Sequence, residues 1–231
     1  MSFVLLWAKR LLLGCFALLL LYQFWLFGWV LWWNWVNPDT TRFMNIRLEE
    51  SQVKDPQAQL KKQWVGYERI SINLKRAIIA AEDAKFVDHE GFDWEGIQHA
   101  IERNQQKGRV VAGGSTISQQ LAKNLFLTPA KTPWRKAEEA VITLMLESVW
   151  SKQRILEVYL NVIEWGNGVF GADAAARHYY GVSASQLSPE QAARLAGMVP
   201  SPRFYDRNRN APGLARKTAI ILARMRSADP P

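Results

Sequence analysis

The clearest pattern along the chain is a long apolar run near the N-terminus. No charged side chain occurs from Leu11 to Trp33. A helix of these 23 residues would be long enough, at about 1.5 Å per residue, to cross the roughly 30 Å core of a bilayer. A cleaved signal peptide is the alternative, but its apolar region would be about 7 to 15 residues long and would end at small residues. Here the run continues into "WVLWWNW", so we interpret residues 11–35 as a retained transmembrane anchor.

The residues that flank the run predict its orientation. Tryptophans crowd its C-terminal end: Trp25, Trp29, Trp32, Trp33 and Trp35. Indole rings prefer the interface between membrane and water, so this end should lie at a membrane surface. Lys9 and Arg10 precede the run, which indicates that residues 1–10 form a short cytoplasmic tail. Arg42 and Arg47 follow the run and weaken this charge bias.

Beyond the anchor, polar sequence gives way to helical periodicity. Residues 36–62 are polar and are expected to form a stalk, followed by a domain over 63–231. Capping signals such as Thr132 before Pro133 and "SPEQ" at 188–191 mark helix starts. Helices are predicted at 74–85, 94–106, 116–126, 133–150, 152–162, 172–180, 189–198 and 214–226. Few segments alternate as strands do, so the fold class is mainly α, with 62–72 and 108–114 as loops or a minor hairpin.

Composition and charge narrow the classes of function. The 231 residues with 48% hydrophobic content can build one sizeable core. Residues 34–231 hold all 21 acidic and 27 of the 29 basic residues, a net charge of +6. This excess favours an anionic partner, which could be nucleic acid, a membrane surface or a phosphorylated substrate. Cys15 is the only cysteine, the three histidines are scattered, and no zinc pattern or cofactor motif is present.

The stretch "AEDAKFVDHEG" places a carboxylate on an apolar helix face. Ile78, Glu82 and Phe86 follow one another at i, i+4 and i+8, so they share one side of the helix. A surface ion pair at a helix end would be the simplest explanation. For catalysis, partial burial would favour the protonated form of Glu82 and bring its basicity into a useful range. Asp83 and His89 are then candidates to orient Glu82.

Two glycines lead into a hydroxyl pair and a helix in "VVAGGSTISQQLAKNLFL", residues 110–127. Free backbone N–H groups and the positive end of a helix dipole favour an anion there. An ordinary N-cap by Ser115 or Thr116 is the alternative. The stretch is not a Walker loop, because the Lys-Ser/Thr pair after the second glycine is missing. Four polar residues follow that need not all face water: Gln119, Gln120, Lys123 and Asn124.

A third stretch, "TPWRKAEEAVITLMLE" at 132–147, combines a charged start with an apolar continuation. Arg135 and Glu139 lie at i and i+4 on one face, where a structural salt bridge is one explanation. The following "AVITLML" is apolar all round, which is typical of a helix at the centre of a fold. With Lys123, the pair Arg135 and Lys136 would otherwise form a basic cluster suited to a diphosphate.

Taken together, these stretches resemble the peptidoglycan glycosyltransferases with a lysozyme-like fold. The resemblance covers roughly residues 64–205 through "EDAKFVDHEG", "GGSTISQQLAKN", "RKAEEA" and "SKQRILEVYLNVIEWGNGVFGADAAARHYYG", in the family's order. It implies that Glu82 is the catalytic base, that Glu139 is a second motif glutamate, and that Lys123 and Arg135 hold a pyrophosphate. The predicted catalytic residues are Glu82, Glu139 and Asp83, and the predicted substrate-binding residues are Lys123, Arg135, Gln119, Gln120, Ser115, Thr116, Asn124 and Lys136.

The resemblance also implies a reaction and a place in the cell. Lipid II would be joined to a lipid-linked glycan chain by an inverting β-1,4 transfer with release of undecaprenyl diphosphate. A divalent cation, magnesium or manganese, stays open as a cofactor, with Glu139 as its candidate ligand. The domain would face the periplasm from the bacterial inner membrane, with division or elongation proteins as open partners. We also expect residues 125–134, "LFLTPAKTPW", to dip into the bilayer.

Three other classes are weighed against this assignment. A lysozyme-like glycan hydrolase would also use a glutamate, but it would not need Lys123, Arg135 and Lys136. A nucleic-acid binder could use the positive charge, yet the anchor and the lack of a groove-reading pattern argue against it. A penicillin-binding transpeptidase is suggested only by "SQVK" at 51–54 and "SIN" at 71–73. Its Lys-Thr-Gly partner is missing, so these are chance matches.

Overall fold

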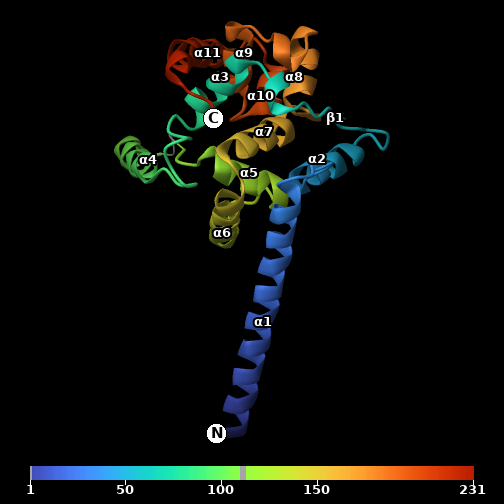
Figure 1. Cartoon of the computed structure of the whole chain (residues 1–231), viewed down its shortest axis with the longest axis vertical. Helices are drawn as coiled ribbons and strands as arrows, with labels where there is room; N and C mark the ends of the chain where they lie inside the picture. The colour runs from blue at the N-terminus through green and yellow to red at the C-terminus, as the bar shows by residue number, and fades with distance from the viewer. Residues whose placement is uncertain (1, 110–112) are drawn as a thin grey trace. The chain divides into compact units, whose positions relative to one another are not determined.

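The computed structural model describes residues 2–109 and 113–231, without the side chains of Ser2 and Val4. The chain divides into two compact units, residues 1–38 and 39–231, whose elements are labelled in Figure 1.

The first unit is one long helix, α1 (Ser2–Trp33). Its segment Leu5–Trp33 has a mean hydropathy of 2.0 and is long and apolar enough to cross a membrane. Because the helix begins at Ser2, most of the expected N-terminal tail continues it. The rings of Trp25 and Trp29 lie 6.4 Å apart and those of Trp29 and Trp33 lie 5.2 Å apart. The aromatic residues therefore form a ladder along the last turns of α1.

The second unit is built mainly from helices, which confirms the predicted fold class. Its α-helices are α2 (Arg42–Gln52), α3 (Ile72–Glu82), α4 (Trp94–Lys107), α5 (Ile117–Phe126), α6 (Pro133–Val149), α7 (Lys152–Val162), α8 (Ala172–Tyr180), α9 (Pro189–Met198), α10 (Pro202–Arg207) and α11 (Pro212–Arg224). Short 3-10 turns lie at η1 (Tyr67–Arg69), η2 (Ala184–Gln186) and η3 (Met225–Ser227). The predicted capping residues act as expected, since Thr132 and Ser188 accept from backbone N–H groups of α6 and α9.

Two groups of helices share the core of this unit. Helix α9 packs against α3 and α11, while α5 packs against α6 and α7, as Figure 1 also shows. Leu74, Ile78 and Leu121 are fully buried, and so are the large rings of Tyr159 and Trp165. Helices α3 and α5 therefore have apolar faces fixed by packing, and the ends of these two helices hold most of the candidate site residues.

Helix α6 differs from the expectation that it lies at the centre of the fold. Ile142 and Leu146 are fully buried, but Val141 is 41% exposed and Leu144 is 56% exposed. The helix packs on α5 and α7, and Val141 and Leu144 stay exposed. That prediction was wrong, because an apolar sequence all round a helix does not reveal whether both sides find a packing partner.

The segment 36–62, expected as a stalk, contains helix α2, which belongs to the second compact unit. Thr41 caps it by accepting from the Met44 backbone N–H at 3.2 Å. Phe43 and Met44 are buried, and α2 packs on α5. Only two of its apolar residues are buried. The mainly polar sequence therefore did not indicate that this helix packs on the domain.

A small sheet was also not predicted in this arrangement. β1 (Lys61–Lys62) pairs in parallel with β3 (Val169–Phe170), which pairs antiparallel with β2 (Glu164–Gly166). The turn between β2 and β3 uses Gly168 at φ +69°, a conformation that suits glycine. Residues 108–109 and 113–114 are neither helix nor strand, whereas the rest of the predicted loop or hairpin at 108–114 lies outside the described residues.

Candidate active site

Two adjoining hollows meet at Glu82 and Ser115. The smaller has a volume of about 170 Å³ and is lined by the end of α3, the start of α4 and residues 113–116. The larger has a volume of about 520 Å³ and is strongly charged. Its charged residues are Arg47, Glu82, Lys123, Lys131, Arg135, Lys136, Glu139 and Glu164. We call this larger hollow the charged cleft.

Glu82 is the last residue of α3 and faces both hollows. The predicted apolar face is present, since Ile78 and Phe86 are fully buried. One carboxylate oxygen of Glu82 accepts a hydrogen bond of 2.7 Å from the Gln120 amide. Within residues 2–109 and 113–231, the other oxygen has no hydrogen-bond partner. Burial raises the pKa of Glu82, while the hydrogen bond from Gln120 and the charges of Lys217 and Lys123 limit the rise.

Tyr159 fixes the amide that contacts Glu82. Its hydroxyl donates to the Gln120 side-chain oxygen at 2.9 Å, so the amide nitrogen is the end that points to Glu82. Burial raises the pKa of Tyr159 well above its usual value, which keeps the phenol protonated as a donor. Tyr159 was not among the predicted site residues, because only the packing of α7 against α5 brings it to Gln120.

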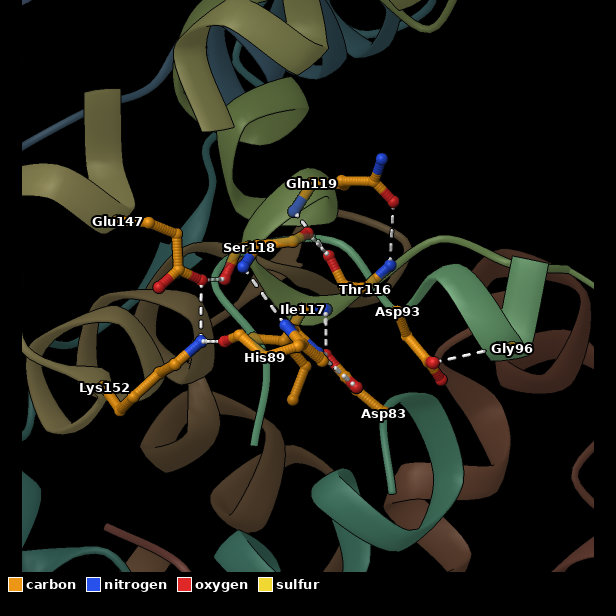
Figure 2. Close-up of polar contacts among 11 residues, drawn as sticks. Asp83, His89, Asp93, Gly96, Thr116, Ile117, Ser118, Gln119, Glu147 and Lys152 are labelled. Carbon is orange, nitrogen blue, oxygen red and sulfur yellow. Dashed lines mark hydrogen bonds and ion pairs between the residues drawn. The ribbon is translucent and has the colours of Figure 1, made fainter. Parts of the chain in front are cut away.

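Asp83 has a different environment from its neighbour. Figure 2 shows its carboxylate between His89 and the first turn of α5. It accepts from His89 Nε2 at 2.9 Å and from the Ile117 backbone N–H at 3.0 Å, and its side chain is 1% exposed. A carboxylate at a helix N-terminus also interacts favourably with the helix dipole. Asp83 therefore joins α3 to α5.

His89 continues this network toward α6 and α7. Its Nδ1 accepts from the Gly91 backbone N–H at 3.1 Å, so Nε2 carries the proton donated to Asp83. The Lys152 ammonium bridges the His89 carbonyl at 2.5 Å and Glu147 at 2.8 Å. The Ser118 hydroxyl donates to the same Glu147 carboxylate at 2.5 Å (Figure 2). Glu147 and Lys152 were not predicted, since long-range packing brings them here.

Gly91 ends the motif "EDAKFVDHEG" for a steric reason. Its φ is +91°, and a Cβ at this position would lie 2.8 Å from Thr143 Cγ2. A side chain would thus clash with α6 as well as strain the backbone. The Gly91 carbonyl accepts from the Thr116 hydroxyl at 2.7 Å, which draws the loop after α3 onto the start of α5.

The start of α5 was predicted to bind an anion through free backbone N–H groups, but capping side chains largely bind these groups instead. Thr116 and Gln119 form a capping box, in which each side chain binds the other's backbone N–H. Gln119 is 3% exposed and lines neither hollow. Thr116 lines the smaller hollow, and the exposed Ser115 lines both. Of the two residues considered as the N-cap, Thr116 therefore has that role. The Ser115 hydroxyl instead accepts a hydrogen bond of 3.2 Å from the Lys136 ammonium.

Lys123 and Asn124 extend from α5 into the charged cleft. The Asn124 amide donates to the Gln120 carbonyl at 2.7 Å. Burial lowers the pKa of Lys123, partly offset by Glu139 and Glu82. In the part of the chain that the structure describes, the Lys123 ammonium makes no hydrogen bond or ion pair. The ammonium also lies over the ring of Phe43, whose centroid is 5.9 Å away.

Arg135, Lys136 and Glu139 form one cluster on α6, as the i, i+4 spacing predicts. Glu139 is 3% exposed, and its two oxygens accept separately from Arg135, at 2.5 Å, and from Lys136. Arg135 Nε is buried without a hydrogen-bond partner. The predicted salt bridge is therefore present, and the same two cations also line the charged cleft.

A metal site at Glu139 does not fit these contacts. Both of its oxygens already bind cationic side chains, which a divalent ion would have to displace. Over residues 2–109 and 113–231, no group of three or more His, Cys, Asp and Glu side chains is suited to hold an ion. The mechanism below therefore uses only the residues of the chain.

The structure brings most of the predicted residues to one place and adds others. Gln120, Lys123, Asn124, Arg135, Lys136 and Glu139 line the charged cleft, and Asp83 lines the smaller hollow. Phe43, Arg47 and Glu164 also line the cleft but were not predicted. Phe43 and Arg47 lie in the segment expected as a stalk, and Glu164 lies in a stretch that carries the resemblance but was not singled out there. Ser51 and Ser71, from the transpeptidase-like matches, donate to the backbone carbonyls of Arg47 and Leu187.

Comparison with known proteins defines the class of this site. The family model described as Transglycosylase matches residues 49–226. The chain belongs to the transglycosylase family, whose activity makes it a glycosyltransferase of peptidoglycan synthesis. It is 77% identical over 225 residues to a protein of Dechloromonas aromatica (strain RCB), covering 97% of each chain. It is 65% identical over 220 residues to a protein of Methylobacillus flagellatus (strain ATCC 51484 / DSM 6875 / VKM B-1610 / KT), covering 95% of this chain and 96% of the other. Both relatives are named biosynthetic peptidoglycan transglycosylase.

Proposed function

We propose that this chain polymerises lipid II into β-1,4-linked glycan strands, with inversion at the donor sugar and release of undecaprenyl diphosphate. Family membership supports peptidoglycan transglycosylation, and the site supports the finer assignment. The observation that carries it is the position of Glu82 between the smaller hollow and the charged cleft, with one carboxylate oxygen unpartnered among the described residues.

Glu82 is the general base of this proposal. The acceptor's sugar hydroxyl gives its proton to the free Glu82 oxygen as its own oxygen attacks the donor's anomeric carbon. The bond from that carbon to the diphosphate oxygen breaks, and the electron pair leaves with the diphosphate. Burial raises the pKa of Glu82, which makes the carboxylate a stronger base than an exposed one. Attack from the face opposite the leaving group inverts the anomeric configuration.

The cations of the cleft stabilise the departing diphosphate. Burial lowers the pKa of Lys123, and its ammonium forms no ion pair among the described residues. A bound diphosphate would supply the missing charge, and this interaction grows as negative charge develops in the transition state. Arg135 and Lys136 lie on the other wall, and Glu139 fixes both of them. Glu139 therefore positions the cations in this mechanism.

Membrane attachment fits substrates that carry lipid tails. We propose that α1 is a single-pass anchor in the inner membrane, with the N-terminus in the cytoplasm and the catalytic domain in the periplasm. Of the residues 125–134 that were expected to contact the bilayer, Leu125 and Leu127 are only 2% and 4% exposed. Trp134 is 73% exposed, and Val141 and Leu144 continue an exposed apolar stripe along α6. We assign the second contact to this stripe.

The membrane proposal has a direct test. A truncated chain beginning at Asn37 should still bind liposomes, and Trp134→Ser/Leu144→Ser should weaken that binding several-fold, because two apolar anchors are lost. Unchanged binding in the double variant would place the contact elsewhere.

The function itself is tested with labelled lipid II and the full-length chain in detergent. The expected result is polymer and undecaprenyl diphosphate appearing together, with no cleavage of preformed peptidoglycan. A membrane-anchored glycan hydrolase is the alternative, and it predicts the reverse pattern on the two substrates. Family membership favours the transferase, and the cation-lined cleft gives a diphosphate a binding site that a hydrolase would not use.

A further inference from the structure

Helix α2 contributes side chains to the charged cleft although its first residues precede the part of the chain that matches the family. The family match begins at residue 49. Phe43 and Arg47 nevertheless line the cleft together with Glu82 and Lys123. The family model alone therefore does not cover this wall of the site.

The ring of Phe43 lies near two cations. The Arg47 guanidinium carbon is 4.7 Å from the ring centroid, and the Lys123 ammonium is 5.9 Å from it. Both distances fall within the range in which a cation is attracted to the electron-rich face of a ring. Phe43 is 7% exposed, and a desolvated setting strengthens such attraction. The ring therefore adds to the electrostatic support that the carboxylates of Glu139 and Glu82 give the Lys123 ammonium.

A cluster of charges holds this helix face in place. Arg47 lies 2.8 Å from Glu50 on its own helix and 3.3 Å from Glu164 on β2. Arg203 on α10 lies 3.1 Å from Glu50 and 3.3 Å from Glu164. The side chain of Glu164 is 6% exposed, so attraction to it is weakly screened by solvent. The cluster ties α2 to β2 and α10 and thereby fixes the position of Phe43.

We propose that α2 is a wall of the catalytic cleft and that Phe43 is a positioning residue that holds the Lys123 ammonium beside the departing diphosphate. The inference deepens the proposed function and rests on it, since Lys123 binds the diphosphate only in that mechanism. The contact between Phe43 and Lys123 can be tested without any reaction.

The first measurement is the pKa of Lys123 in the full-length chain, followed by NMR with ¹³C-labelled lysine in detergent micelles. Phe43→Leu keeps an apolar side chain but removes the ring. Because the ring favours the charged amine, its loss should lower the pKa of Lys123 further, by about half a pH unit. Phe43→Tyr keeps a ring and should restore the wild-type value. The other groups that act on Lys123, namely Glu139, Arg135, Glu82 and Lys136, are the same in all variants.

The second measurement is polymerisation of lipid II by the same variants. Phe43→Leu should lower kcat/KM by about two- to tenfold, and Phe43→Tyr should recover most of it. Met44→Ala is the matched control, since Met44 is buried on α2 but does not line the cleft. It should lower thermal stability and leave the pKa of Lys123 unchanged.

The two measurements separate the inference from the function on which it rests. An unchanged pKa of Lys123 in Phe43→Leu, or an equal shift in Met44→Ala, would overturn the role of Phe43. A shifted pKa with full polymerisation would uphold the contact and overturn the role of Lys123 in the proposed mechanism. A shifted pKa with reduced kcat/KM supports both.

Discussion

The network around Asp83 and the charged cleft around Glu82 begin at adjacent residues but differ in how their polar groups are used. The Asp83 carboxylate accepts from both a side chain and a backbone N–H and is almost fully buried. The Glu82 carboxylate has one described hydrogen bond and a raised pKa. The Asp83 network joins α3, α5, α6 and α7, whereas the cleft keeps hydrogen-bonding capacity for a ligand.

This difference agrees with the proposed mechanism, in which one short motif supplies both a support and a reacting group. Satisfied buried hydrogen bonds stabilise one arrangement of the backbone, because leaving any of them unmade is costly. A reacting group needs the opposite, namely a free lone pair and a basicity shifted by its surroundings. The two residues are neighbours at the end of α3 and both line the smaller hollow, so that rigidity at Asp83 helps to fix the geometry of Glu82.

Glu82→Gln should have the largest effect on activity. The amide is nearly isosteric but cannot accept the proton, so polymerisation should fall by about 10²- to 10⁴-fold. The folded state should be kept or slightly stabilised, because the raised pKa of Glu82 means that burial disfavours its charge. Rates with lipid II and the melting temperature check both statements. Normal turnover in this variant would remove Glu82 from the mechanism.

Lys123→Ala/Arg135→Ala tests the other side of the cleft. Each charge-assisted contact to a diphosphate contributes about 1.5–3 kcal/mol, so the double variant should lose roughly a hundredfold or more in binding and polymerisation. Binding of phosphoglycolipid inhibitors, which carry a similar anionic linkage, should weaken in parallel. Lys131→Ala is the control, because Lys131 is an exposed cation of the same cleft and should matter less.

The same double variant distinguishes a transferase from a hydrolase. A hydrolase of finished glycan meets no diphosphate, so its activity should survive the loss of both cations. Cleavage of preformed peptidoglycan by the wild type that persists in the double variant, without any lipid II polymer, would overturn the proposed function.

Asp83→Asn should affect stability more than it affects chemistry. The oxygen of the asparagine side-chain amide could accept from only one of the two donors, His89 Nε2 or the Ile117 backbone N–H. The amide NH₂ group would then face the other donor, and no hydrogen bond would form there. The loss of a buried charge-assisted hydrogen bond is expected to lower stability by about 1.5–3 kcal/mol and the melting temperature by several degrees. Polymerisation should fall by less than in Glu82→Gln. An equal loss of activity with unchanged stability would make Asp83 a reacting group.

Much of this comparison could be predicted from local sequence. The periodicity of α3 marked Glu82 as a carboxylate on an apolar face, and the i, i+4 spacing marked the pair of Arg135 and Glu139. Such patterns are reliable because they depend on the geometry of one helix. The motif order then brought Lys123, on α5, to the same site. The catalytic and binding roles of these residues stay predictions until the variants are measured.

The remaining parts depend on contacts that a local pattern does not contain. Tyr159 reaches Gln120 only through the packing of α7 on α5, and Glu147 reaches Ser118 only because α6 crosses near the same helix. The segment that forms α2 was expected to be a stalk, because its sequence is mainly polar. Which side of such a helix becomes buried depends on the surface against which it packs. Sequence therefore indicated the charged residues that line the cleft better than the residues that hold them in place.

Glu164→Gln should have the smallest effect and probes a buried charge on the rim of the cleft. Burial raises the pKa of Glu164 to about 7. A carboxyl group whose pKa is raised in the folded state contributes stability below its unfolded value of 4.5, and this contribution is lost as the pH rises through about 7. The full effect is on the order of 3 kcal/mol, so the melting temperature of the wild type should fall by several degrees between pH 5 and pH 8. The uncharged glutamine removes most of this pH dependence of stability and should lower polymerisation only slightly.

Glu50→Gln is the matched control, because Glu50 contacts the same two arginines but its side chain is 45% exposed. A pH dependence in Glu164→Gln as steep as in the wild type would mean that Glu164 is already fully ionised at pH 5, and its ion pairs with Arg47 and Arg203 would then outweigh its burial.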